Sequence, residues 1–153
     1  MRTLVRAVLF LVAALSLASS AIADGPSAEA RALYQRFVAA QNDHDLAAVR
    51  ALLSDSPQFL WVSNGMSFWG ADTVVERMAS FQEAEVWRVE PDLDAAVAVE
   101  VGAGAAYLHL PLTLVIGRAD NPSMLRFLVS MLAQETEDGW RIAALFTTSE
   151  NPG

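Results

Sequence analysis

The sequence predicts an α+β fold, in which helices come first along the chain and strands follow. Two observations support this prediction. Up to residue 81, most apolar side chains recur three and four positions apart, which is the spacing of one helical face. Beyond residue 97 they alternate or form long apolar runs bounded by turn residues, which is typical of strands. Segregation of helices from strands predicts an α+β domain rather than an α/β one.

Two helices are expected near the start of the domain. The first covers residues 28–41, and Ser27 can cap it with its side-chain oxygen. A polar break follows, in which Asp43 or Asp45 can cap a second helix over residues 46–53. The face of the first helix that should be buried consists of Ala30, Leu33, Phe37 and Ala40.

A hairpin and a third helix come next. Residues 58–63 are aromatic and β-branched, Asn64-Gly65 suits a type I′ turn, and residues 66–69 form the return strand. Gly70-Ala71-Asp72 then opens the third helix. Its apolar face consists of Val74, Val75, Met78 and Phe81.

The rest of the chain is expected to form strands. The acidic stretch 83–94 is interpreted as a solvated connection, and alternating valines at 97–101 form a strand. The apolar run 105–116 contains Pro111, which has no N–H for a ladder and predicts a bulge, a bend or an edge. The last two strands, 124–135 and 140–148, should pair through the intervening turn.

The composition excludes several classes of function. The chain has 153 residues, enough for about one domain, and carries a formal charge of −8 without cysteine or lysine. It therefore lacks the clustered cations that bind nucleic acid or an anionic membrane surface. Its two histidines are far apart and no spaced acidic ligands accompany them, so no metal or other cofactor is expected.

Residues 1–23 are expected to be a secretory signal peptide. Two arginines precede an apolar run from Ala7 to Leu15, and Ala21-Ile22-Ala23 fits the small-x-small cleavage pattern. The run is shorter than the ~20 residues of a membrane-spanning helix; the alternatives are an uncleaved anchor or an N-terminal core helix. The sequence thus predicts one domain over residues 24–153, secreted or periplasmic after cleavage behind Ala23.

Short motifs spread over residues 27–149 share their order with those of a known superfamily. The motifs are Gln35-Arg36-Phe37-Val38-Ala39-Ala40, Asn42, Asp45-Leu46, Gly70-Ala71 and Gly139-Trp140-Arg141-Ile142. In this order the chain resembles the nuclear transport factor 2-like superfamily, which includes SnoaL-like polyketide cyclases and ketosteroid isomerase. The resemblance implies a cystatin-like α+β roll: a cone-shaped, strongly curved, mostly antiparallel sheet wrapped around about three N-terminal helices, with a pocket at its open end.

The same resemblance exposes a departure at the reactive positions. Ketosteroid isomerase uses a tyrosine on its first helix as oxyanion donor, an aspartate on its first strand as base and a protonated aspartate deeper in the sheet. The positions that match them here are Phe37, Trp61, and Val129 or Ser130. None of these side chains transfers a proton as that chemistry requires, so isomerisation by that mechanism is not expected.

His109 is the strongest candidate for a catalytic proton carrier. It alternates with Tyr107 and Thr113 on one face of its strand, opposite a leucine-rich face. Two interpretations are open. His109 is either a general base in a cavity, or a histidine of the core or of an interface whose ring nitrogens have hydrogen-bond partners. Tyr34, Tyr107 and Thr147 are weaker candidates to assist it, although a threonine without a neighbouring base is not an activated nucleophile.

Aromatic side chains are the strongest positive feature. A period of two places Trp140, Ile142, Ala144 and Phe146 on one face of the last strand. Together with aromatics elsewhere they can line an apolar binding pocket or simply fill the core. The candidate pocket residues are Phe37, Trp61, Trp69, Met78, Phe127 and Phe146.

The predicted sheet is apolar on both faces. The run 108–114 carries leucines on one face. On the next strand, Leu128 and Leu132 alternate along one face with Arg126, Ser130 and Gln134. A small sheet with two apolar faces suggests a partner on the second one, and a homodimer through the outer face is the simplest choice. Many members of the resembled superfamily dimerise in this way.

Three functions remain open at this point. The first is a secreted dimeric domain that binds a small, largely apolar molecule. The second is an enzyme of the SnoaL-like type, an isomerase, cyclase or lyase of a small hydrophobic substrate that uses His109. The third is a non-catalytic, dimeric association module. The direction of His109 and the volume of the cavity discriminate between them.

Overall fold

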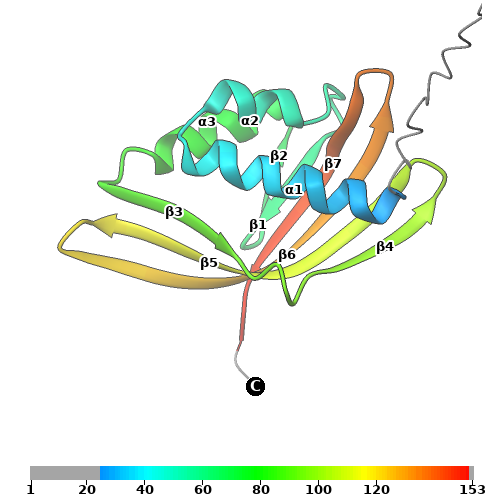
Figure 1. Ribbon diagram of the computed structural model, residues 1–153. Coiled ribbons are helices and arrows are strands. Elements are labelled where there is room, and N and C mark those ends of the chain that lie inside the picture. The colour runs from blue at the N-terminus through cyan, green and yellow to red at the C-terminus, as the bar shows by residue number, and fades with distance from the viewer. Residues whose placement is uncertain (1–24, 152–153) are drawn as a thin grey trace, which may run out of the picture.

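The computed structural model describes residues 25–151, in which three helices cover one face of a strongly curved, open sheet (Figure 1). The strand order is β2-β1-β7-β6-β5-β3, and β4 also pairs with β5. Strands β1 and β7 are parallel, and the other neighbours are antiparallel. The elements are α1 (Pro26–Asn42), α2 (Leu46–Leu52), β1 (Leu60–Ser63), β2 (Met66–Trp69), α3 (Ala71–Phe81), β3 (Val86–Pro91), β4 (Val97–Gly102), β5 (Ala105–Arg118), β6 (Asn121–Thr136) and β7 (Gly139–Ser149).

This architecture confirms the predicted α+β class and the cystatin-like roll with its curved sheet. The expected signal peptide, residues 1–23, lies outside the described residues. Helix α1 crosses the concave face of the sheet, and its buried residues pack on β3, β4, β5 and β7. The core between them includes Leu33 and Phe37 from α1 and Leu108, Leu110 and Met131 from the sheet.

Local chemistry explains where the helices begin. Asp45 caps α2 as expected, because its carboxylate accepts a hydrogen bond of 2.8 Å from the backbone N–H of Ala48. The expected cap at Ser27 is wrong: Gly25 occupies the N-cap position of α1. Pro26 follows as the first helical residue, where its fixed φ fits the helix and its missing N–H leaves no bond unmade.

The Asn64-Gly65 hairpin forms as the sequence predicts. Both turn residues have positive φ, 47° and 83°, as a type I′ turn requires. The turn sets the register in which Ser63 pairs with Met66 and Trp61 with Phe68. Trp61 and Phe68 therefore share the inner face of the sheet.

The acidic stretch after α3 is not a simple connection, since β3 forms within it. Trp87 and Val89 face the core, while Arg88 and Glu90 alternate with them on the outer face and form an ion pair of 2.6 Å. Strands β3 and β4 pair with two successive parts of β5. Pro111 lies at the junction, where its carbonyl accepts the N–H of Asp92. Its missing N–H thus falls at a local edge, one of the three outcomes expected for this proline.

A β-bulge in β7 decides which side chains face the helices. Leu132 pairs with Ala144, but Ala133 pairs with Ile142, so Ala143 is an extra residue in β7. An extra residue reverses the alternation of faces beyond it. Ile142 and Leu145 are both buried in the core for this reason, although they are three positions apart.

Candidate functional site

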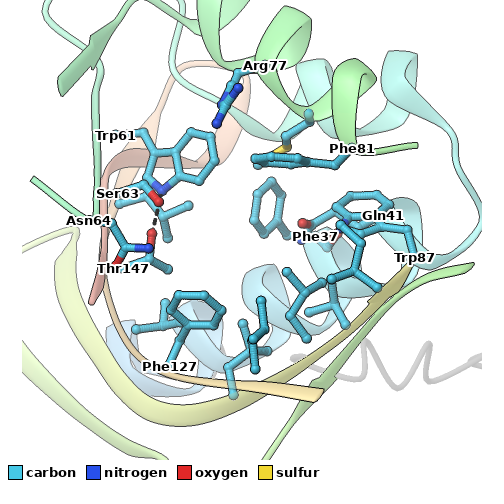
Figure 2. Close-up of a pocket in the computed structure, with 18 of the residues that line it drawn as sticks. Phe37, Gln41, Trp61, Ser63, Asn64, Arg77, Phe81, Trp87, Phe127 and Thr147 are labelled. Carbon is cyan, nitrogen blue, oxygen red and sulfur yellow. Dashed lines mark hydrogen bonds between the residues drawn. The ribbon is translucent and has the colours of Figure 1, made fainter. Parts of the chain in front are cut away.

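A cavity of about 260 Å³ opens between the inner face of the sheet and helices α1 and α3 (Figure 2). Its wall is mainly apolar, with several aromatic rings, and polar side chains are few. The apolar lining residues are Phe37, Trp61, Met66, Met78, Phe81, Trp87, Val89, Leu112, Leu114, Ile116, Leu125, Phe127, Val129 and Leu145. The polar ones are Tyr34, Gln41, Ser63, Asn64, Arg77 and Thr147.

Strands β1 and β7 form one polar side of the cavity. The indole N–H of Trp61 donates a hydrogen bond of 2.7 Å to Oγ1 of Thr147. The Thr147 hydroxyl in turn donates to the backbone carbonyl of Val62 at 3.2 Å. Ser63 and Asn64 lie beside this pair, as Figure 2 shows. The chain of hydrogen bonds fixes the Trp61 ring, which is 6% exposed.

Helix α1 contributes two further polar groups of the wall, Tyr34 and Gln41. The Gln41 amide is buried, and its Nε2 donates to the carbonyl of Phe37 at 3.3 Å. Figure 2 places Gln41 beside Phe37 and Trp87, across the cavity from Trp61. Burial raises the pKa of the Tyr34 phenol far above its ordinary value, because the charged form would lose its hydration. Tyr34 is therefore neutral and does not act as a base at ordinary pH.

Arg77 is the one charged residue among the described residues that line the cavity. It comes from α3, and its guanidinium lies 4.6 Å from the centre of the Phe81 ring and 5.8 Å from that of Phe68. Both distances are within the range of a cation–π contact. The side chain is half-buried at the upper rim of the cavity in Figure 2.

The structure brings together most of the side chains expected in the pocket. Phe37, Trp61, Met78 and Phe127 all line the cavity. Trp69 and Phe146 do not, and their expected place needs correction.

The two corrections have separate physical causes. Trp69 pairs with Leu60 on the outer face of the β1–β2 hairpin, one position out of phase with the inward Phe68, and is 57% exposed. Phe146 lies beyond the Ala143 bulge, which turns it to the outer face, where it is 40% exposed.

His109 and Tyr107 also lie on the outer face. They alternate with the buried Leu108 and Leu110, and Nδ1 of His109 is 2.9 Å from the hydroxyl of Ser130 on the neighbouring strand. Of the two interpretations left open for His109, a general base in the cavity does not fit this position, because strand alternation turns the side chain away from the cavity. Tyr34 and Thr147 do line the cavity, but no histidine or carboxylate accompanies them among the described lining residues.

Sequence reasoning missed three lining residues for which signals exist. Gln41 follows Phe37 by four positions and therefore shares its helical face. Arg77 precedes Phe81 by four in the same way on α3. Trp87 lies in the alternating segment that forms β3, which its acidic neighbours obscured.

Residues 25–151 show neither a metal-binding cluster nor a membrane-spanning helix. Within this range, no group of three or more histidines, cysteines, aspartates and glutamates is placed to hold a metal ion. No helix of the same part of the chain is long and apolar enough to cross a membrane.

Comparisons with known proteins agree with this architecture. A family model described as a SnoaL-like domain matches residues 30–145. A nuclear transport factor 2-like superfamily protein from Salmonella enterica serovar Typhimurium superposes with a TM-score of 0.72 at 15% identity, covering 82% of this chain and 92% of that one. No curated protein matches the sequence.

Two further solved structures are similar. A protein with a cystatin-like fold from Caulobacter vibrioides has a TM-score of 0.70 at 23% identity and covers 84% of this chain and 92% of its own. A ketosteroid isomerase-like protein from Erwinia carotovora has a TM-score of 0.65 at 20% identity, with 82% and 97% covered. Identities this low establish a shared fold and leave activity open.

Proposed function

The chain belongs to the SnoaL-like domain family, and we propose that it binds a small, largely apolar molecule in the cavity. The observation that carries the proposal is the wall itself, in which aromatic and aliphatic side chains surround an open space and polar groups are few. Concave apolar sites with a small number of placed polar groups are the usual form of small-molecule sites. The described lining residues include no aspartate, glutamate or histidine, so the two aspartates of ketosteroid isomerase have no counterpart in this wall.

The size of the cavity sets the expected affinity. A ligand that buries about 200 Å² of apolar surface gains roughly 5 kcal/mol at about 25 cal/mol per Å². Loss of translational and rotational freedom opposes this gain by several kcal/mol. Apolar burial alone therefore gives dissociation constants no tighter than about the millimolar range, and polar contacts decide which ligand binds best.

Ligand-detected NMR with a set of small apolar molecules tests the proposal. Leu114→Phe places extra volume in the cavity and should abolish binding, whereas Leu93→Phe in the exposed β3–β4 connection should leave it unchanged. Thermal melting of both variants checks that they fold. Absence of any binding to the unmodified protein, or equal binding by the Leu114 variant, would overturn the proposal.

Catalysis through His109 lacks support from the geometry, since this residue lies outside the cavity. An enzyme would have to use Tyr34 or Thr147 without a histidine or carboxylate among the described lining residues. Neither side chain is an effective proton acceptor at neutral pH. Binding without proton transfer is the function that this wall supports best.

We further propose that the protein forms a homodimer through the outer face of its sheet. The pairing of the strands lines up two rows of side chains across this face. The first row is apolar, and in the second the His109–Ser130 pair lies between Phe146 and Val97. Contiguous exposed apolar surface of this kind is typical of protein interfaces. The first row consists of Trp69, Leu60, Ala144, Leu132, Tyr107 and Val99.

Sedimentation equilibrium measures the proposed dimer. Phe146→Asp places a charge in the apolar face and should lower the mass from that of a dimer to that of a monomer. Leu93→Asp, at a similarly exposed apolar residue away from the sheet face, should leave the mass unchanged. A monomeric unmodified protein, or a dimer unaffected by Phe146→Asp, would contradict the proposal.

Export of the domain is a separate proposal, supported by the charged, apolar and small-residue order of residues 1–23. Expression of the full chain in a bacterial host, followed by N-terminal sequencing of the exported fraction, should give Asp24 as the first residue. Retention in the cytoplasm with an intact N-terminus would refute it.

A further inference from the structure

Arg77 has no acidic partner, whereas four of the other seven arginines of the described chain do. These four form ion pairs with aspartates or glutamates: Arg50, Arg88, Arg118 and Arg126. Acidic residues outnumber arginines, yet no carboxylate of the described residues lies within ion-pair distance of Arg77. Its neighbours on α3 at three and four positions are all uncharged.

Aromatic rings hold the guanidinium in place. It lies over Phe81, one turn later on α3, and near Phe68 of β2. A guanidinium stacked on rings keeps the N–H groups at its edge available, and their fork matches the two oxygens of a carboxylate. Arg77 is therefore a fixed, half-buried cation at the mouth of an apolar cavity, with its hydrogen-bonding capacity unused by the described protein.

We propose that the ligand of this cavity is an amphipathic monocarboxylate whose anionic head binds Arg77 and whose apolar tail fills the space below it. This inference rests on the proposed binding function. Figure 2 shows Arg77 above Trp61, on the same side of the cavity as Ser63 and Asn64. A head group at Arg77 thus lies on the side where the polar lining residues of β1 and its turn are found.

The cavity volume limits the length of the tail. At about 30 Å³ for each water molecule of the liquid, 260 Å³ corresponds to roughly nine waters. A ligand of about ten non-hydrogen atoms is therefore the right size. Octanoate has this size and shape, and octanamide is its uncharged isostere. The two differ in the charge that Arg77 would recognise.

Calorimetric titration of both compounds into the unmodified protein and two variants tests the inference. The unmodified protein should bind octanoate at least about tenfold more tightly than octanamide, as charge-assisted hydrogen bonds to a half-buried guanidinium predict. Arg77→Gln should remove this preference while octanamide binding changes little. Arg36→Gln, at an exposed arginine of α1 away from the cavity, should retain it.

The outcomes separate this inference from the proposed function. Equal binding of the two compounds, or a preference that survives Arg77→Gln, overturns the carboxylate assignment and leaves an apolar binding site. Failure of both compounds to bind the unmodified protein contradicts the carboxylate assignment and the proposed function together. Arg77→Lys checks the geometry, because it keeps the charge, loses the planar fork and should retain only part of the preference. Circular dichroism confirms that each variant is folded.

Discussion

The hydrogen bond between Trp61 and Thr147 gives the sharpest test of how the cavity wall is held. The indole N–H of Trp61 is directed at Oγ1 of Thr147 at 2.7 Å, and the ring is 6% exposed. Thr147→Val replaces the hydroxyl by a methyl group with little change of volume. It removes the acceptor of the Trp61 N–H and the donor to the Val62 carbonyl in one step.

The expected loss of stability follows from these two bonds. A buried N–H left without an acceptor costs about 1–3 kcal/mol, and an ordinary hydrogen bond contributes about 0.5–1.5 kcal/mol. The second bond is long, 3.2 Å, so its share is at the low end. We expect Thr147→Val to lower the free energy of unfolding by about 2 kcal/mol, a sizeable part of a typical total of about 5–15 kcal/mol.

Urea unfolding followed by circular dichroism measures this loss. Thr147→Ser is the matched control, because it keeps the hydroxyl and removes only a half-buried methyl group, which costs less than about 0.8 kcal/mol. In a Trp61→Phe background, where no indole N–H exists, Thr147→Val should cost at least 1 kcal/mol less than in the unmodified protein. Additive effects of the two substitutions, or equal losses for the valine and serine variants, would refute the role assigned to this bond.

Two further predictions concern the turn and a buried phenol. Gly65→Ala should destabilise the protein by about 1–2 kcal/mol, since φ is +83° and no atom lies within 4 Å to add a steric cost. Gly102→Ala, equally open but without positive φ, should change stability by less than about 0.5 kcal/mol in the same denaturation assay; similar losses at both sites would contradict the backbone explanation. The raised pKa of Tyr34 keeps its phenol protonated in the folded state, so its contribution is complete below pH ~10 and is lost as pH rises above that value, by up to about 1.4 kcal/mol per pH unit. Unfolding curves between pH 9 and 11 should show this loss in the unmodified protein but not in Tyr34→Phe, and identical pH profiles would exclude it.

Elements defined by their own residues could be predicted from the sequence. The Asn64-Gly65 turn needs only two residues that tolerate positive φ. Asp45 caps α2 through a side chain three positions before the N–H it accepts. The first helix also follows from its own apolar spacing. Such features depend on contacts close in sequence, and the structure reproduces them with shifts of one or two residues.

The acidic residues around β3 predict a solvated connection and obscure the alternation of its side chains. Trp87 and Val89 are inward-facing positions of a period-two pattern, and Arg88 and Glu90 are its solvated partners. Their ion pair across the outer face shows that the charges are compatible with a strand. Without this strand the candidate site lacks two of its lining residues, because Trp87 and Val89 both line the cavity.

The face assignment of β7 depended on a contact that the local sequence does not contain. No glycine or proline marks the bulge at Ala143, which is set by the pairing of β7 with β6. Uninterrupted alternation from Trp140 places Phe146 inside, whereas the bulge places Leu145 and Thr147 there instead. One extra residue therefore exchanges an aromatic ring for the hydroxyl that fixes Trp61.

The positions at which this chain differs from ketosteroid isomerase lie close together in the folded chain. The resemblance matches its three proton-handling positions to Phe37, Trp61, and Val129 or Ser130. Phe37, Trp61 and Val129 come from α1, β1 and β6 and line the same cavity, whereas Ser130 lies on the outer face beside His109. Because these three side chains line one cavity, the differences from ketosteroid isomerase at their positions all affect the same site. The same space is left with apolar walls, neutral polar groups and a single cation at its mouth, Arg77. The wall offers apolar contacts and one cation but no histidine or carboxylate among the described lining residues, so it suits the proposed recognition better than proton transfer.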